Sequence, residues 1–352
     1  MSATISGSIS CALPIATHDR VVLGHGSGGK LSAALLKEHF LPHLQSHALH
    51  LLGDGAVVSA GHTQVVLSTD TFVVHPLEFR GGDIGVLAVN GTVNDLAMMG
   101  AVPSYLTAGF IIEEGLPIEV LDRIVMSMAR AATIAGVQVV AGDTKVVEHG
   151  KGDGLFINTT GLGLASSEFR PSPTRAQPGD AILVSGSIGV HGITILSTRE
   201  GLGFEADLSS DTACLYPLVT VLRRATDDDV ATLRDPTRGG VASTLNEIAA
   251  ASNVGVEIEE SGLPVPVAVS GACEMLGLDP LYVANEGIFV AFVPERRAEQ
   301  ALEAMRAHPL GANAARIGTV VGDHRGLVVM RTSLGGTRVV DMLPGDQLPR
   351  IC

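Results

Sequence analysis

The sequence feature that most constrains the fold is a long amphipathic helix flanked by two strand-like runs. Pro117–Ala135 carries apolar side chains at helical spacing on one face, namely Leu121, Ile124, Val125, Met128 and Ala132. Ser104–Ile112 precedes this segment and Val137–Ala141 follows it, and both have the composition of strands. The same alternation of strand and helix recurs after Ala181. The pattern therefore predicts a chain in which helices and strands alternate throughout.

Length and composition limit the class of protein. A chain of 352 residues is too long for one ordinary core and predicts two domains of about 150 residues each. The hydrophobic content is 46%, but no apolar run approaches the roughly 18 residues that a membrane span needs, so we expect no membrane partner. With 42 Gly, 9 Phe, 3 Tyr and no Trp, the core must consist of small aliphatic side chains.

The charge and the cysteines indicate further properties. A net charge of −14 argues against nucleic acid as a partner, because clustered Lys and Arg are missing. An acidic protein can still bind a nucleotide through magnesium. The four cysteines form no C-x-x-C pair, which argues against a zinc or disulfide framework and suits a reducing compartment. The first residues lack a signal-peptide pattern, so we expect a cytoplasmic protein.

A glycine-rich turn enters a helix near the N-terminus. Gly24–Lys30 matches a phosphate-binding P-loop except that Leu31 occupies the position of the magnesium-binding Ser or Thr. The backbone of Gly28 and Gly29 can bind phosphate as a lid, or the segment is a structural turn. A row of His side chains follows, and Pro42 interrupts it, which favours a solvated face over a metal site.

Several acidic residues lie where strands end or helices begin. Each can be a turn former or helix cap, but together they resemble a magnesium cage of hard oxygen ligands: Asp54, Asp70, Asp95 and Asp143. In the second half, Asp235 precedes a helix N-terminus, which suits a metal-bound phosphate. Glu286 lies just before the strand Ile288–Val293 and is either a base or a turn residue.

The C-terminal segment Pro344–Cys352 contains two prolines and one glycine and is therefore expected to be extended. Its last residue, Cys352, places a thiol beside a free carboxylate. A cysteine at the end of a chain can be incidental. The remainder of the chain, however, indicates ATP chemistry without an obvious nucleophile, which favours a thiol that carries a substrate.

Seven stretches together resemble the HypE family of hydrogenase maturation proteins. This family lies within the group of ATP-using enzymes that includes aminoimidazole ribonucleotide synthetase and selenophosphate synthetase. The resemblance extends from about His18 to the last residue. The stretches are His25–Lys30, Ser68–Asp70, Gly91–Gly100, Gly142–Val147, Asp235–Gly240, Ala284–Gly287 and Pro349–Cys352.

The resemblance implies an α+β fold with two α/β domains, each an open mixed sheet with helices on one side. It also implies a homodimer in which the N-terminal sheets form a barrel, with ATP near the interface. We therefore expect five segments: a flexible N-terminal segment with the Gly-rich loop (1–50), an ATP-binding and dimerisation domain (51–165), a linker (166–179), a C-terminal domain (180–335) and a mobile tail (336–352).

The resemblance also implies an activity and a set of roles. Cys352 would accept a carbamoyl group from the carbamoyltransferase HypF. ATP-dependent dehydration would then give a thiocyanate, and its cyanide would pass to iron on the HypC–HypD scaffold for the nickel-iron centre. Phosphorylating the amide oxygen would create a good leaving group. Glu286 and Lys145 would serve as general base and as stabiliser of negative charge or proton-transfer aid, in roles left open. Mg2+ ligands would be Asp54, Asp70, Asp95, Asp143 and Asp235, with Asn94, Thr144, Gly28 and Gly29 also binding ATP or phosphate.

One departure and three alternatives accompany this interpretation. Asp54-Gly55 replaces the paired acids of many relatives, so one metal ligand is missing or is water. A selenophosphate synthetase should carry Cys or selenocysteine in Gly24–Lys30, which contains neither. A ribonucleotide synthetase needs no terminal thiol. A non-catalytic scaffold would use the tail only for docking and would bind ATP without turning it over.

Overall fold

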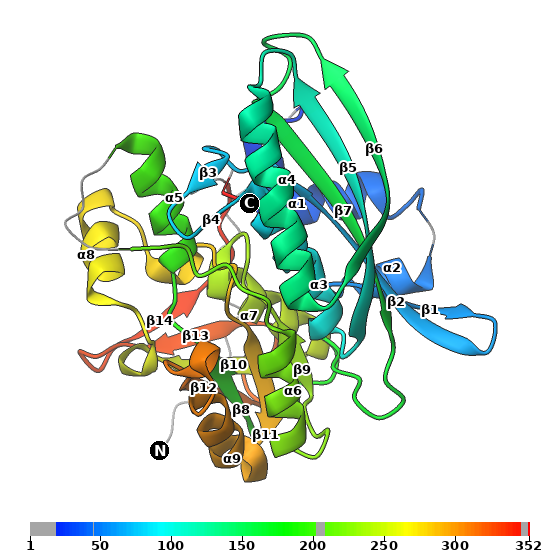
Figure 1. Ribbon diagram of the computed structural model, residues 1–352. Helices are drawn as coiled ribbons and strands as arrows, with labels where there is room; N and C mark the ends of the chain where they lie inside the picture. The colour runs from blue at the N-terminus through cyan, green and yellow to red at the C-terminus, as the bar shows by residue number, and fades with distance from the viewer. Residues whose placement is uncertain (1–18, 45, 202–207, 346–350) are drawn as a thin grey trace, which may run out of the picture.

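The computed structural model describes residues 19–44, 46–201, 208–345 and 351–352, which form two sheet-containing domains (Figure 1). The N-terminal domain has a five-stranded sheet of order β1-β2-β7-β5-β6. Only β5 and β6 are parallel, because α4 connects them as a crossover. The strands are β1 (Ala56–Ala60), β2 (Thr63–Phe72), β5 (Val102–Glu113), β6 (Gln138–Val147) and β7 (Leu155–Leu164).

Two helices, α3 (Ile84–Met98) and α4 (Ile118–Ala135), cover one face of this sheet. Helix α3 begins at Asp83, whose carboxylate accepts hydrogen bonds from the backbone of Gly85 and Val86. Helix α4 ends at Gly136, which adopts a φ of 70° that favours glycine. On the other face, Leu67, Tyr105 and Ile111 are exposed, so no helix of the described chain covers these positions.

The C-terminal domain has a seven-stranded mixed sheet of order β14-β13-β10-β12-β8-β11-β9. Helix α7 packs on one face, and α6 and α9 pack on the other. The strands are β8 (Asp180–Val184), β9 (Thr232–Arg234), β10 (Gly255–Glu259), β11 (Val290–Pro294), β12 (Ala315–Val321), β13 (Val328–Arg331) and β14 (Thr337–Val340). The helices of this half are α5 (Val190–Glu200), α6 (Tyr216–Ala225), α7 (Gly240–Ser252), α8 (Val267–Leu276) and α9 (Glu295–Arg306).

Short elements connect these layers. They are η1 (Leu23–Gly26), α1 (Lys30–Leu35), the π-helix η2 (Leu36–Phe40), α2 (His47–His50), β3 (Glu78–Phe79), β4 (Gly82–Asp83), η3 (Glu260–Gly262), η4 (Pro280–Tyr282) and η5 (Pro309–Gly311). None of the helices in the described ranges is long and apolar enough to cross a membrane.

The predicted fold class, α+β with two mixed sheets and packed helices, is confirmed. The prediction of helices on one side is right for the N-terminal sheet and wrong for the C-terminal sheet. In β8, Ile182 and Val184 face α7, whereas Ala181 and Leu183 face α6 and α9. Strands that are apolar at every position bury both faces, and the unbroken run in β8 already carried this signal.

Two further predictions need correction. The segment expected to be flexible is folded between residues 19 and 44, where its glycine-rich loop packs against the second domain at Arg238 and Leu343. The tail was expected to begin at residue 336, but β14 pairs with β13 and belongs to the C-terminal sheet. A short run of β-branched residues after a glycine turn was the missed signal.

Close backbone approach fixes the loop that carries Glu286. A methyl group at Gly287 would overlap the carbonyl oxygen of Asp211, in the segment that leads into α6. The backbone of Glu286 also donates a hydrogen bond of 3.2 Å to the Asp211 carboxylate. The two segments therefore lie in contact only because residue 287 has no side chain.

We expect Gly287→Ala to lower the free energy of unfolding by about 1–3 kcal/mol, because the overlap forces the two segments apart. Chemical denaturation followed by circular dichroism measures this change. Gly271→Ala in α8 is the matched control, since no atom lies within 4 Å of the added methyl group, and helix propensity predicts a gain of up to about 1 kcal/mol. Equal stabilities for the two variants would contradict the argument.

Candidate active site

Three carboxylates from different parts of the chain converge between the domains. Asp54 lies in the turn before β1, Asp95 in the last turns of α3, and Asp235 directly after β9. One oxygen atom from each lies within 4.8 Å of the others. Carboxylate oxygens are the donors that magnesium prefers in proteins. The donor set therefore fits a divalent cation.

The cluster is electrostatically unbalanced. Burial and the neighbouring carboxylates raise the pKa of Asp95 and Asp235 well above their usual range. Burial also raises the pKa of Asp54 to about 6, although the guanidinium of Arg234 opposes the shift. Arg234 Nε lies 2.9 Å from Asp54, and another of its nitrogens lies 2.9 Å from Glu247. Because one Arg cannot neutralise these acids, the site favours a further cation.

Ser68 and Asp70 extend the site along β2. Ser68 Oγ lies 2.5 Å from an oxygen of Asp95 and 2.8 Å from the backbone oxygen of Asp54. Burial raises the pKa of Asp70, and Arg238 lowers it. Asp70 also raises the pKa of Glu286, which connects the acidic cluster to the loop before β11.

Glu286 is 3% exposed, and its Oε1 atom has no hydrogen-bond partner among the described residues. Burial raises its pKa well above the usual range, Asp235, Asp70 and Asp211 raise it further, and Arg238 opposes them. The neighbouring Asn285 fixes this loop, because its amide nitrogen donates to the carbonyls of Pro236 and Val283 at 3.0 Å. The loop therefore presents a proton-binding carboxyl group, one oxygen of which no described residue pairs.

The C-terminal residue lies in this site. The terminal oxygen of Cys352 accepts a hydrogen bond of 3.0 Å from the backbone of Val73, and the carbonyl of Ile351 lies 2.6 Å from His191 Nε2. Burial raises the pKa of the Cys352 thiol, Arg238 lowers it, and Glu286 and Asp70 raise it. The thiol is therefore within electrostatic range of both Glu286 and the acidic cluster.

Residues 143–145 lie elsewhere in this chain. β6 is the edge strand, and Asp143 and Lys145 align with Gly109 and Ile111 on the face of the sheet that no described helix covers. Both are exposed and form an ion pair with each other. Three strand spacings of about 4.8 Å separate β6 from β2. Asp143 was expected at the end of a strand, but it lies within β6, since the strand continues to Val147.

Thr144 also lies on β6. Its side chain belongs to the row that includes Phe110 and Ile157, on the side of the helices, and it is exposed at the sheet edge. A single chain therefore brings none of residues 143–145 to the carboxylate cluster.

Asn94 was expected to bind ATP or phosphate. Its oxygen accepts a hydrogen bond of 2.8 Å from the backbone of Leu215, and its nitrogen donates to the carbonyl of Ala213 at 3.0 Å. Both polar ends of the side chain therefore bind the segment before α6. This arrangement gives Asn94 a structural role in joining α3 to the second domain.

The glycine-rich loop lies beside the helix that follows Asp235. Gly28 has a φ of 76°, and a methyl group there would lie 2.6 Å from the carbonyl oxygen of Arg238. The hydroxyl of Ser243, in the first turn of α7, donates to the carbonyl of Gly28 at 3.1 Å. The neighbouring Gly29 contacts Leu343. The glycine-rich loop thus lies next to the site, and it contacts residues of the second domain.

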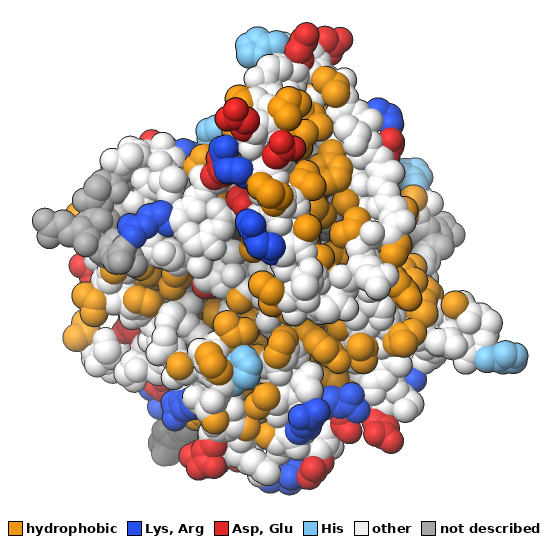
Figure 2. Space-filling model, viewed as in Figure 1, with side chains coloured by type: hydrophobic (Ala, Val, Ile, Leu, Met, Phe, Trp, Pro, Cys, Tyr) orange, Lys and Arg blue, Asp and Glu red, His pale blue; other side chains and the backbone are white. Residues whose placement is uncertain are grey.

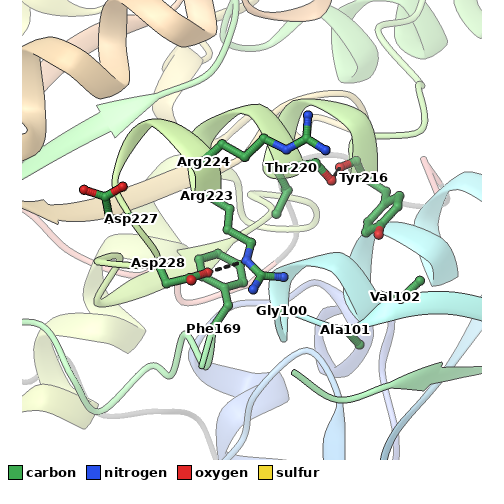
Figure 3. A pocket seen from close by; sticks show the side chains of 11 residues that line it. Gly100, Ala101, Val102, Phe169, Tyr216, Thr220, Arg223, Arg224, Asp227 and Asp228 are labelled. Carbon is green, nitrogen blue, oxygen red and sulfur yellow. Dashed lines mark hydrogen bonds and ion pairs between the residues drawn. The ribbon is translucent and has the colours of Figure 1, made fainter. Parts of the chain in front are cut away.

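A separate cavity of about 530 Å³ lies between the domains (Figure 3). Gly100 and Ala101 line one side, and α6 lines the other with Tyr216 and Arg223. Arg223 forms an ion pair with Asp228, which lies just after the end of α6. None of the predicted site residues lines it, so it is distinct from the carboxylate site.

Sequence reasoning missed several residues of the site. Arg238 and Asn285 stand within stretches that carry the family resemblance, and Arg234 directly precedes one of them, so proximity to Asp235 and Glu286 was an available signal. Asp211 and His191 stand outside those stretches. Their role depends on tertiary contacts that no local pattern encodes.

The chain matches two family models. The model described as AIR synthase related protein, N-terminal domain, matches residues 52–165, and the corresponding C-terminal domain matches residues 177–331. Carbamoyl dehydratase HypE of Azotobacter vinelandii is 56% identical over 332 residues, covering 94% of this chain and 97% of that protein. The protein of the same name from Escherichia coli (strain K12) is 45% identical and covers 95% of this chain and 100% of that protein.

Solved structures that resemble this chain come from the same family. A crystal structure of hydrogenase maturation protein HypE in complex with ATP has a TM-score of 0.79 and 51% identity, covering 95% of this chain and 100% of that one. The crystal structure of a HypE–HypF complex gives a TM-score of 0.84 and 47% identity, covering 88% of this chain and 100% of that one. The chain therefore belongs to the AIR synthase related proteins and, within them, to the HypE family of carbamoyl dehydratases.

Proposed function

We propose that this protein is an ATP-dependent dehydratase acting on a carbamoyl group carried by its own Cys352. The product would be a thiocyanate on the same sulfur, which supplies cyanide for nickel-iron hydrogenase maturation. The observation that supports this best is the position of the chain end. Cys352 lies within electrostatic range of Glu286, Asp70 and Asp235. Relatives that match this chain over nearly their whole length carry the name carbamoyl dehydratase.

The partners follow from the same chemistry. The carbamoyl donor would be the carbamoyltransferase HypF, in keeping with the HypE–HypF complex among similar structures. The cyanide acceptor would be iron on a HypC–HypD scaffold. Burial keeps the docked Cys352 thiol protonated, because its pKa is raised. A protonated thiol is a poor nucleophile, so carbamoylation would take place with the tail outside the site.

Dehydration requires that a poor leaving group becomes a good one. The amide oxygen of the thiocarbamate attacks the terminal phosphoryl group of ATP, and ADP departs. The carbon–oxygen bond then breaks, phosphate leaves, and the nitrogen loses two protons in total, which gives a carbon–nitrogen triple bond. Mg2+ held by Asp54, Asp95, Asp235 and Asp70 would spread the negative charge of the transferring phosphoryl group.

Glu286 would accept a proton from the amide nitrogen. It is buried within electrostatic range of Cys352, and its Oε1 atom has no hydrogen-bond partner in the part of the chain that the structure describes. Repulsion from Asp235 and Asp70 contributes to its raised pKa. If a cation neutralised those carboxylates, the pKa of Glu286 would fall and its carboxyl group would ionise. Burial would still keep that pKa raised, so the ionised Glu286 would be a strong base. Arg238 would steady the ionised form.

Asp143, Thr144 and Lys145 would reach the site from a second copy of the chain. In one chain β6 is an exposed edge, and Asp143 and Lys145 lie on the face of the sheet that no described helix covers. Figure 2 shows hydrophobic side chains gathered over the surface where α4 and β6 lie in Figure 1. Exposed apolar residues there include Val125, Met126, Val139, Val140 and Val146. An unpaired strand with such a surface favours pairing of the N-terminal sheets in a homodimer.

Cys352→Ala should abolish carbamoylation and leave ATP binding intact, because the thiol is the carrier and does not form the nucleotide site. Intact-mass spectrometry after incubation with HypF, its carbamoyl substrate and ATP measures this. The unaltered chain should gain one carbamoyl group and then lose one water. Full labelling of Cys352→Ala would contradict the role of the tail.

Mixed dimers test whether a second copy of the chain supplies Lys145 to the site. Lys145→Ala and Glu286→Ala should each accept the carbamoyl group and fail to dehydrate it. When Lys145→Ala is mixed with Cys352→Ala, about a quarter of the sites should recover, since one subunit supplies the tail and the other supplies Lys145. Glu286→Ala mixed with Cys352→Ala is the matched control and should recover none, because Glu286 and Cys352 act in one subunit. Equal recovery in both mixtures would rule out that one subunit supplies Cys352 and Glu286 while the other supplies Lys145.

Magnesium should stabilise the protein in a pH-dependent manner. The pKa of Asp54 is raised to about 6 by burial, so without metal this group destabilises the fold as pH rises through 6. Metal binding requires the ionised carboxylates, so the rise in melting temperature on adding Mg2+ should be a few degrees at pH 7.5 and much smaller at pH 5.

Differential scanning fluorimetry with and without Mg2+ gives this measurement. Asp235→Asn should remove most of the shift at pH 7.5. The control Asp122→Asn changes an exposed residue of α4 and should keep the full shift. A shift that is equal at pH 5 and pH 7.5 would exclude these carboxylates as the ligands.

A further inference from the structure

His191 makes a contact that the proposed chemistry does not use. It lies in the first turn of α5 and is fully buried. Its Nε2 atom lies 2.6 Å from the carbonyl oxygen of Ile351. Because a carbonyl only accepts, Nε2 carries the hydrogen and donates it. Nδ1 then accepts from the hydroxyl of Ser210 at 2.8 Å, so both ring nitrogens have partners.

The surroundings fix the ring in this orientation. Phe79 packs edge-on against it, with ring centroids 5.7 Å apart and planes at 87°. Ser210 is itself fixed, because its backbone donates to the carbonyl of Arg80 at 2.8 Å and its hydroxyl accepts from the backbone of Thr212 at 3.2 Å. Burial lowers the pKa of His191 to about 4, so the ring is neutral at pH 7.

The end of the chain is thereby bound at several points. His191 holds the carbonyl of Ile351, and the backbone of Val73 holds the terminal oxygen of Cys352 at 3.0 Å. Between these contacts, the Ile351 side chain is buried in the apolar cluster that includes Phe72 and Ile84. Fixing both sides of the last residue restricts where its sulfur atom can lie.

We propose that His191 is a positioning residue, whose Nε2–H docks the Ile351 carbonyl so that Cys352 presents its sulfur-bound group to Glu286. This inference rests on the proposed function for the identity of that group. His191 does not touch the reacting atoms. It acts on the equilibrium between a docked tail, which reacts, and an undocked tail, which meets the carbamoyl donor.

Two measurements on the full chain test the proposal. The first is the alkylation rate of Cys352 by iodoacetamide, read by mass spectrometry of the C-terminal peptide. The second is the single-turnover rate of water loss from the carbamoylated chain after ATP is added. His191→Leu keeps the size of the side chain and removes the donor. It should weaken docking about five- to tenfold, since one buried hydrogen bond is lost, and should therefore raise the alkylation rate and slow water loss by about two- to threefold each.

The matched control is His191→Gln, which retains an N–H donor and should restore both rates to near those of the unaltered chain. The carbamoylation rate should not fall in either variant, because that step uses the undocked tail. Unchanged alkylation in folded His191→Leu would overturn the proposal, as would a His191→Gln variant as impaired as His191→Leu. If His191→Leu does not fold, Ser210→Ala removes the group that selects the Nε2–H tautomer. It should shift both rates about twofold in the same directions, and unchanged rates would overturn the proposal.

Alkylation needs neither ATP nor a carbamoyl donor, so it separates the two proposals. If the chain has no dehydratase activity, the effect of His191→Leu on alkylation still reports tail docking. If dehydration occurs and alkylation does not respond to His191→Leu, the proposed function stands and the positioning role fails.

Discussion

Repulsion among buried carboxylates is the constraint on which the rest of this structure depends. Asp54, Asp95 and Asp235 place oxygen atoms within 4.8 Å of one another, and a single Arg234 offsets part of their charge. Such a cluster is stable only when protonated or when a cation joins it. The segments that carry these acids come from both domains. The fold therefore stores unfavourable energy at the domain boundary, and the binding of a metal–nucleotide complex would release it. The same repulsion reaches Glu286, so the state of the cluster determines how basic that group is.

The sequence indicated the composition of the site better than its geometry. Asp54, Asp70, Asp95 and Asp235 were identified because acids beside turns and helix starts are a local pattern, and the structure brings three of them together. Asp143 was grouped with them on the same grounds, but its strand continues past it and carries it to the sheet edge. Strand ends depend on pairing with β5, which no local pattern contains. His191 and Asp211 could not be found in advance, because their partners are 160 and 75 residues away in the sequence.

If Lys145 acts in the reaction as proposed, the site is divided between two faces of one sheet, and this division would have a mechanistic consequence. The tail and Glu286 lie on the side of the helices, whereas Lys145 lies on the uncovered side of the edge strand. A homodimer that brought the partner's β6 to each site would separate two requirements. Each chain would hold its own substrate-bearing sulfur, and the neighbouring chain would stabilise the charge that develops during the reaction. Activity would then depend on assembly, and a lone chain could bind its tail without completing the reaction.

A carrier residue must bind its own site weakly enough to leave it. Burying Ile351 contributes about 2 kcal/mol, and its two flanking hydrogen bonds contribute about 1 kcal/mol each. Ordering the last two residues costs about 2–4 kcal/mol in backbone entropy and about 1 kcal/mol in side-chain entropy. These terms nearly cancel, so the tail would exchange between docked and undocked states. Because the two states are similar in population, losing a single donor such as His191 changes both populations enough to measure. A stronger clamp would improve dehydration and hinder carbamoylation, and for this reason a neutral hydrogen bond suits the task better than an ion pair.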